Sequence, residues 1–176
     1  MSLVTFAYAG VPVTIFHFGP GALLKALVPR WISLTAFVIS QVVIDLESGY
    51  HLLRQEWPIH RHLHSLVLAG VAGLLSGTLV FLAAQIAKPR RFAVSRSEVG
   101  ILPAHVGGLI GGVSHSVLDS FMHFDLVPFW PFSNNNSLLD TLSMGALHIL
   151  CVASGLVGVA VLAIRWFLST ASQKSP

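Results

Sequence analysis

Long apolar stretches separated by short polar segments dominate the chain and predict membrane-spanning helices. The clearest stretch runs from Ser65 to Ala87, 23 residues without a charged side chain. As an α-helix it is about 35 Å long, at ~1.5 Å per residue. Because the hydrocarbon core of a bilayer is about 30 Å thick, this helix is long enough to cross it. Two further spans are predicted at Val99–Met122 and Leu142–Leu168.

A fourth, shorter span is predicted at Trp31–Ile44. The preceding stretch Gly21–Val28 could lengthen it, but Pro29 between them is expected to kink or break the helix. Segment 1–15 is apolar, yet it contains a glycine and a proline and lacks a basic start and a small-residue cleavage site. It therefore predicts an interfacial segment or an extension of the fold, and not a signal peptide.

These elements predict an all-α fold with one integral-membrane domain over residues 1–176. The domain is a bundle of about four transmembrane helices, with a short re-entrant or interfacial helix near the N-terminus. Segment 1–15 is expected to be an extension, and 169–176 a disordered tail. Composition supports this class, because 54% of the residues are hydrophobic and only 10% are charged, against about 25% charged in an ordinary soluble domain.

Basic residues gather at one end of the predicted bundle. Eight of the ten Lys and Arg lie before the first span, in loop 88–96, or at and beyond the end of the last span, and only Arg54 and Arg61 lie at the other end. Since short loops rich in Lys and Arg remain on the cytoplasmic side, loop 88–96 and the C-terminus are expected to be cytoplasmic. The opposite end of the bundle then faces outward.

Histidines and carboxylates collect at this predicted outer end, where the spans begin or end. An Asp at the centre of a membrane helix costs roughly 2.5–3.5 kcal/mol on insertion scales, so ionisable residues in spans usually have a function. Only seven acidic residues occur in the whole chain, and three of them belong to this group. Its members are Asp45, Glu47, His60, His64, His115, Asp119 and His123.

The spacing of these residues predicts which side chains point together. His60 and His64 are four residues apart, as are His115 and Asp119, so each pair would lie on one face of a helix. Imidazole nitrogens and carboxylate oxygens suit Zn²⁺, Mn²⁺ or Fe²⁺. Taken alone, each pair also has a structural interpretation, namely two histidines at a wet helix end and a His–Asp hydrogen bond.

Asp45 and Glu47 add two carboxylates that would face the same way in a frayed or extended helix end. The donors together exceed those that one tetrahedral ion needs. The surplus leaves room for a second ion, or for a carboxylate acting as a general base. Whether His17 lies at the outer or the inner end is left open by the pattern.

The polar motifs also follow the order of a known family. They read His17-Phe-Gly-Pro-Gly, Ile44-Asp45-Leu46-Glu47, His60-x3-His64-Ser65 and Ser114-His115-x2-Leu118-Asp119-Ser120. Their order and spacing resemble the YdjM-like bacterial inner-membrane proteins, a family described as metal-dependent hydrolases, over roughly residues 16–132. Two departures occur, since the family more often has Pro-Asp-x-Asp at residues 44–47 and Thr-His-Ser at 63–65.

The resemblance implies a helical protein of the bacterial inner (plasma) membrane with a His/Asp metal centre. The metal ligands that it implies are His17, Asp45, Glu47, His60, His64, His115 and Asp119. One or two divalent ions are expected, with zinc favoured and manganese or iron as alternatives. Glu47 and Asp119 are the candidate catalytic residues.

The leading hypothesis is a membrane-bound hydrolase that activates water against a phosphoester or acyl bond. Location alone suggests a lipid-derived substrate, with membrane lipid as the partner and no nucleic acid. The oligomeric state is not predicted. Three alternatives remain, namely a transporter of ions, protons or metal, a haem-binding pair of spans, and a non-catalytic protein whose polar cluster only holds the helices together.

Overall fold

The computed structural model describes residues 14–87 and 96–172 and is all-helical over these ranges. Most of the predicted N-terminal extension, loop 88–95 and residues 173–176 lie outside the described residues. The elements are α2 (Thr14–Leu27), α3 (Leu34–Leu53), the 3-10 turn η1 (His62–His64), α4 (Leu66–Ala87), α5 (Arg96–Val99), α6 (Ile101–Ser120) and α7 (Met144–Ser172).

Three of the described helices are long and apolar enough to cross a membrane, and they match the three clearest predicted spans. They are α4, α6 and α7. A shorter apolar helix, Ile15–Leu27 within α2, lies near the N-terminus. The predicted fourth span corresponds to α3, which is not among the three. The tail predicted to be disordered from residue 169 is instead helical up to Ser172.

Helix α3 is longer than the sequence suggested. It begins after Ser33, whose side chain accepts a hydrogen bond from Ala36 N, and it ends only at Leu53. The predicted end near Ile44 is therefore wrong. Because no proline or glycine pair interrupts the segment after Ile44, the helix continues, and its polar residues find partners in other segments. Asp45 and Glu47 consequently lie on a regular helix.

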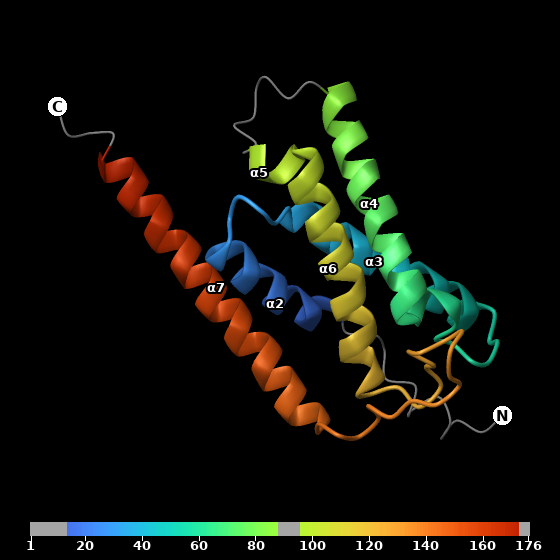
Figure 1. Ribbon diagram of the computed structural model, residues 1–176. Helices are drawn as coiled ribbons and strands as arrows, with labels where there is room; N and C mark the ends of the chain where they lie inside the picture. Colours follow the sequence, from blue (N-terminus) through green and yellow to red (C-terminus); the bar gives the residue numbers. More distant parts are fainter. Residues whose placement is uncertain (1–13, 88–95, 173–176) are drawn as a thin grey trace.

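Helix α6 is central and lies close to both α3 and α4 (Figure 1). A Cβ atom on Gly108 would overlap the carbonyl oxygen of Gly73 in α4. A Cβ atom on Gly111 would overlap the hydroxyl of Ser40 in α3. The close helix approach predicted from the glycines of α6 is thus confirmed, and it occurs on two sides of the helix. Helix α7 packs against α2 beside this unit.

The connector between α3 and α4 and the loop after α6 lie at the same end of the bundle (Figure 1). They are joined by a backbone hydrogen bond from Leu66 N to Pro128 O, 2.8 Å long. The start of α3, the end of α4 and the start of α6 lie at the opposite end. The fold therefore brings the C-terminal part of α3, the N-terminus of α4 and the C-terminal part of α6 together.

Candidate metal centre

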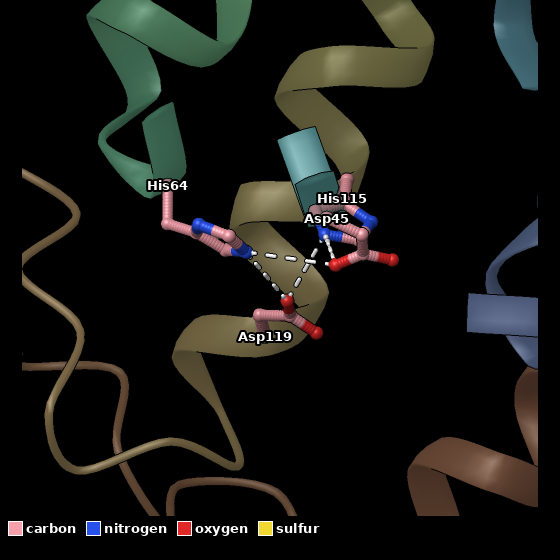
Figure 2. A group of neighbouring side chains, drawn as sticks. All are labelled: Asp45, His64, His115 and Asp119. Atoms are coloured by element: carbon pink, nitrogen blue, oxygen red, sulfur yellow. Dashed lines mark ion pairs between the residues drawn. The ribbon is translucent and has the colours of Figure 1, made fainter. Parts of the chain in front are cut away.

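Four side chains from three separate segments converge at the connector end of the bundle (Figure 2). His115 Nε2 lies 3.1 Å from both Asp45 Oδ1 and Asp119 Oδ2. His64 Nε2 lies 3.7 Å from Asp45 Oδ1 and 3.6 Å from Asp119 Oδ2. We refer to Asp45, His64, His115 and Asp119 as the four-residue centre.

The fold positions these donors on rigid elements. His115 and Asp119 are one turn apart on α6, as their spacing predicted, and Asp45 comes from the neighbouring helix α3. His64 closes η1 immediately before α4. The side chains of His64, His115 and Asp119 are at most 3% exposed, and that of Asp45 is 14% exposed. The centre is therefore largely shielded from solvent.

The geometry of the four-residue centre fits a divalent ion. A tetrahedral ion with bonds of about 2.0–2.2 Å has neighbouring ligand atoms about 3.3–3.6 Å apart, and the four separations here range from 3.1 to 3.7 Å. His115 Nε2 and Asp119 Oδ2 are buried and make no hydrogen bond, although they are so close. The two groups nevertheless lie 3.1 Å apart as an ion pair, so the direct His115–Asp119 pairing that the sequence left open remains an alternative to a bound ion.

His17 lies behind His115 and contacts its other ring nitrogen. The two Nδ1 atoms are 3.3 Å apart, and His17 Nε2 lies 3.6 Å from Asp119 Oδ1. If His115 Nε2 keeps its lone pair for an ion, Nδ1 carries the proton and donates it to His17. The remaining proton of His17, on Nε2, then faces Asp119. His17 therefore contacts two members of the centre, His115 and Asp119. It does so at Nδ1 of His115 and Oδ1 of Asp119, and not at the Nε2 and Oδ2 atoms that face each other within the centre.

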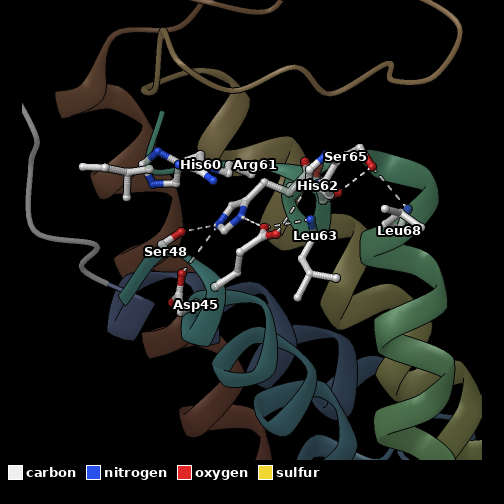
Figure 3. Close-up of polar contacts among 12 residues, drawn as sticks. Asp45, Ser48, His60, Arg61, His62, Leu63, Ser65 and Leu68 are labelled. Carbon is white, nitrogen blue, oxygen red and sulfur yellow. Dashed lines mark hydrogen bonds and ion pairs between the residues drawn. The ribbon is translucent and has the colours of Figure 1, made fainter. Parts of the chain in front are cut away.

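Glu47 and Ser48 of α3 contact opposite nitrogens of the His64 ring, and Figure 3 shows Ser48 and Asp45 on the side of α3 that faces the connector carrying His60 and Leu63. Ser48 Oγ lies 3.2 Å from His64 Nε2, whereas Glu47 Oε2 lies 3.7 Å from His64 Nδ1. The same carboxylate oxygen accepts a 2.8 Å hydrogen bond from Leu63 N. Glu47 therefore faces the edge of His64 opposite the four-residue centre, an arrangement typical of carboxylates that orient a metal-binding histidine.

The helix face that His60 and His64 were predicted to share does not form, so that part of the prediction is wrong, although their rings still lie 4.9 Å apart between centroids. Residues 54–61, which include Pro58, form an irregular connector. Only the short turn η1 precedes the helix that begins at Leu66. His60 instead joins His123 and Asp125, a set that we call the second cluster. A donor atom of each lies within 4.8 Å of the others. No motif in the sequence pointed to Asp125, which lies in the loop after α6.

Contacts within the second cluster shift the pKa of two of its members. Burial alone would raise the pKa of Asp125, but the hydrogen bonds from His60 and Ile59 outweigh it and lower the pKa to about 2. Burial and the nearby His60 lower the pKa of His123 to about 4. At neutral pH the cluster therefore contains a carboxylate and an uncharged His123 imidazole.

The other histidines have ordinary partners. His105, toward the opposite end of α6, lies 2.7 Å from Ile101 O and 3.0 Å from Thr78 Oγ1 through its two ring nitrogens. His51 lies 2.8 Å from Glu56 Oε2. The ring of His148 packs against Phe16.

Comparison with known proteins does not extend this description. No family model, curated protein or solved structure matches the chain. Over residues 14–87 and 96–172 the structure is helical, with three helices able to span a membrane and His/Asp groups that could hold a metal ion.

Proposed function

We propose that the protein is a membrane-bound, metal-dependent hydrolase whose divalent ion is held by the four-residue centre. The observation that carries the proposal is the convergence of two imidazole nitrogens and two carboxylate oxygens at ligand-like separations. The buried atoms His115 Nε2 and Asp119 Oδ2 make no hydrogen bond there. Buried polar atoms without partners are uncommon, and an ion would satisfy both of them.

A divalent ion in this position would supply Lewis-acid chemistry, which activates water and polarises a phosphoester or acyl group. The surrounding residues hold the donors in place. His17 fixes which nitrogen of His115 carries the proton, and Glu47 orients His64 from the far edge of its ring. In this proposal Glu47 is a positioning residue, because its carboxylate faces Leu63 N and His64 and not the middle of the centre.

Asp45 marks the side from which water and substrate would reach the ion, since it is the most exposed of the four side chains. The basic residues of loop 88–96 would lie on the cytoplasmic side of a bacterial inner membrane and the four-residue centre near the outer surface. A substrate derived from membrane lipid fits this location. The proposal also retains zinc as the favoured ion and the YdjM-like family as the expected relatives.

Metal analysis joined to a hydrolysis assay tests this function. Purified protein in detergent should contain about one tightly bound divalent ion per chain or more, and should hydrolyse a chromogenic phosphomonoester, phosphodiester or acyl ester. Asp119→Asn should lose the tight ion and the hydrolysis. His105→Ala, on the same helix but at its other end, should retain both. A bound ion without hydrolysis of any of the three substrates would count against the enzyme and favour a structural ion.

A further inference from the structure

The connector before α4 and the loop after α6 meet around one carboxylate, that of Asp125. Its Oδ2 accepts hydrogen bonds from Ile59 N at 2.8 Å and from His60 N at 3.0 Å. Its Oδ1 lies 2.9 Å from His60 Nδ1. Both oxygens are therefore occupied in holding the segment that carries His60, and the imidazole ring is fixed in one orientation.

The second ring nitrogen of His60, Nε2, is left buried with an unused lone pair. When Nδ1 donates to Asp125, Nε2 is the acceptor nitrogen of the neutral ring. Nε2 is buried, and no hydrogen-bond partner for it exists among the residues that the structure describes. The whole residue is only 5% exposed. A carboxylate on one ring nitrogen and an available lone pair on the other is the usual arrangement of a metal-binding histidine.

His123 brings a second imidazole to the same place. Its ring stacks on that of His60, with the centroids 3.9 Å apart and the planes inclined by 27°. One donor atom from each of His60, His123 and Asp125 lies within 4.8 Å of the other two. Two imidazoles are frequent ligands of Zn²⁺ and Fe²⁺, and here the nearby carboxylate contacts His60 rather than the ion.

A cavity of about 440 Å³ adjoins this cluster. His60 and Asp125 line it together with Trp57, Arg61 and Trp130. An ion held by the buried His60 Nε2 would therefore lie next to this cavity. The four-residue centre is more enclosed, because three of its four donor side chains are at most 3% exposed and only Asp45, at 14%, borders solvent.

We propose that His60, His123 and Asp125 form a second divalent-cation site, distinct in its ligands from the four-residue centre, adjacent to it through the rings of His60 and His64, and bordering the cavity. His60 Nε2 and His123 supply the lone pairs, and Asp125 orients His60 and adds a negative charge. With fewer protein ligands and an open side, this site binds its ion more weakly than the four-residue centre. It does not depend on whether the protein is a hydrolase.

Equilibrium dialysis of the full chain against Zn²⁺ in detergent tests the second site. The unaltered protein should bind two ions per chain with distinct affinities, and a chelator should remove the weaker ion first. His123→Ala should lose the weaker ion. Asp125→Asn should lower the affinity for this weaker ion about tenfold to a hundredfold, as is typical when the outer partner of a metal-binding histidine is lost. His62→Ala is the matched control, because His62 lines the same cavity with an exposed side chain.

The two sites can fail separately in this experiment. Asp119→Asn should lose the tight ion and keep the weaker one, with gel filtration and circular dichroism showing that each variant is folded. A single ion that is unaffected by both His123→Ala and Asp125→Asn would overturn the second site and leave the four-residue centre standing. Loss of only the tight ion in His123→Ala would also overturn it, and binding of no ion would overturn both sites.

Discussion

The two ends of the helix bundle both bury ionisable side chains, but they satisfy them differently. At the end where α2 leads into α3, Lys25 forms an ion pair with Glu98 and also donates to Ile32 O at 2.7 Å. Glu98 in turn accepts hydrogen bonds from the backbone and the hydroxyl of Thr35, both 3.1 Å long. At the other end, the buried atoms His115 Nε2 and Asp119 Oδ2 approach each other without a hydrogen bond.

This contrast separates a structural polar cluster from a site for a ligand. Lys25 and Glu98 are opposite charges whose neighbours use their remaining hydrogen-bonding capacity, so nothing further is needed to stabilise them. In the four-residue centre, nitrogen and oxygen atoms from three segments face a common point. Burying them in this way is costly unless positive charge balances the two aspartates, and either protonated His64 and His115 or a metal ion between the four side chains can supply it. Among the described residues, the His/Asp groups that could hold a metal ion therefore lie at one end of the bundle.

The largest expected effect comes from removing a direct ligand. His115→Ala should weaken binding of the tight ion more than about a hundredfold, because loss of an outer partner alone typically costs about 10–100-fold. Glu98→Gln, at the opposite end, should leave binding unchanged. Competition with a chelator of known affinity measures both variants. Equal losses in the two variants would contradict the division of roles between the ends.

A smaller effect is expected from an outer residue of the same end. Glu47→Gln should lower the affinity for the tight ion about tenfold to a hundredfold, because a neutral amide orients the His64 ring less strongly than a carboxylate does. The ion should still bind at saturation, with one tight ion per chain in metal analysis. Complete loss of the ion would instead make Glu47 a direct ligand, as the sequence motif implied.

The smallest effect on metal binding is expected at the satisfied end. Lys25→Met should lower the free energy of unfolding by about 1–3 kcal/mol, since Glu98 loses its charged partner within a partly buried site. Affinity for the tight ion should change by less than about twofold. Denaturation in mixed detergent micelles measures the stability, and dialysis measures the ion. A stable variant with impaired ion binding would reverse the proposed contrast.

Local patterns correctly indicated much of the bundle. The apolar stretches identified α4, α6 and α7, and the i, i+4 spacing of His115 and Asp119 placed both side chains on one face of α6. The glycines of α6 correctly indicated close helix packing. These features depend on helical periodicity and on residue size, which are properties of a single segment.

Features that depend on irregular segments were predicted less well. The i, i+4 argument failed for His60 and His64 because their segment is a connector with one short turn. Asp125 was missed because its role comes from hydrogen bonds to the backbone of a segment 65 residues earlier in the chain. The predicted end of α3 near Ile44 is too early. The polar residues that follow Ile44 indicate a helix end in the sequence, but the helix continues to Leu53.

The sequence by itself determined the helical class, the three long apolar helices and the supply of His and Asp donors. It did so because hydrophobic length and helical spacing are local properties. Only the tertiary structure decided how the donors divide into the four-residue centre and the second cluster. It also decided which of them, like Glu47, face away from the four-residue centre. That division depends on contacts between α3, α6 and two connecting segments, and no spacing along the chain specifies the distances between them.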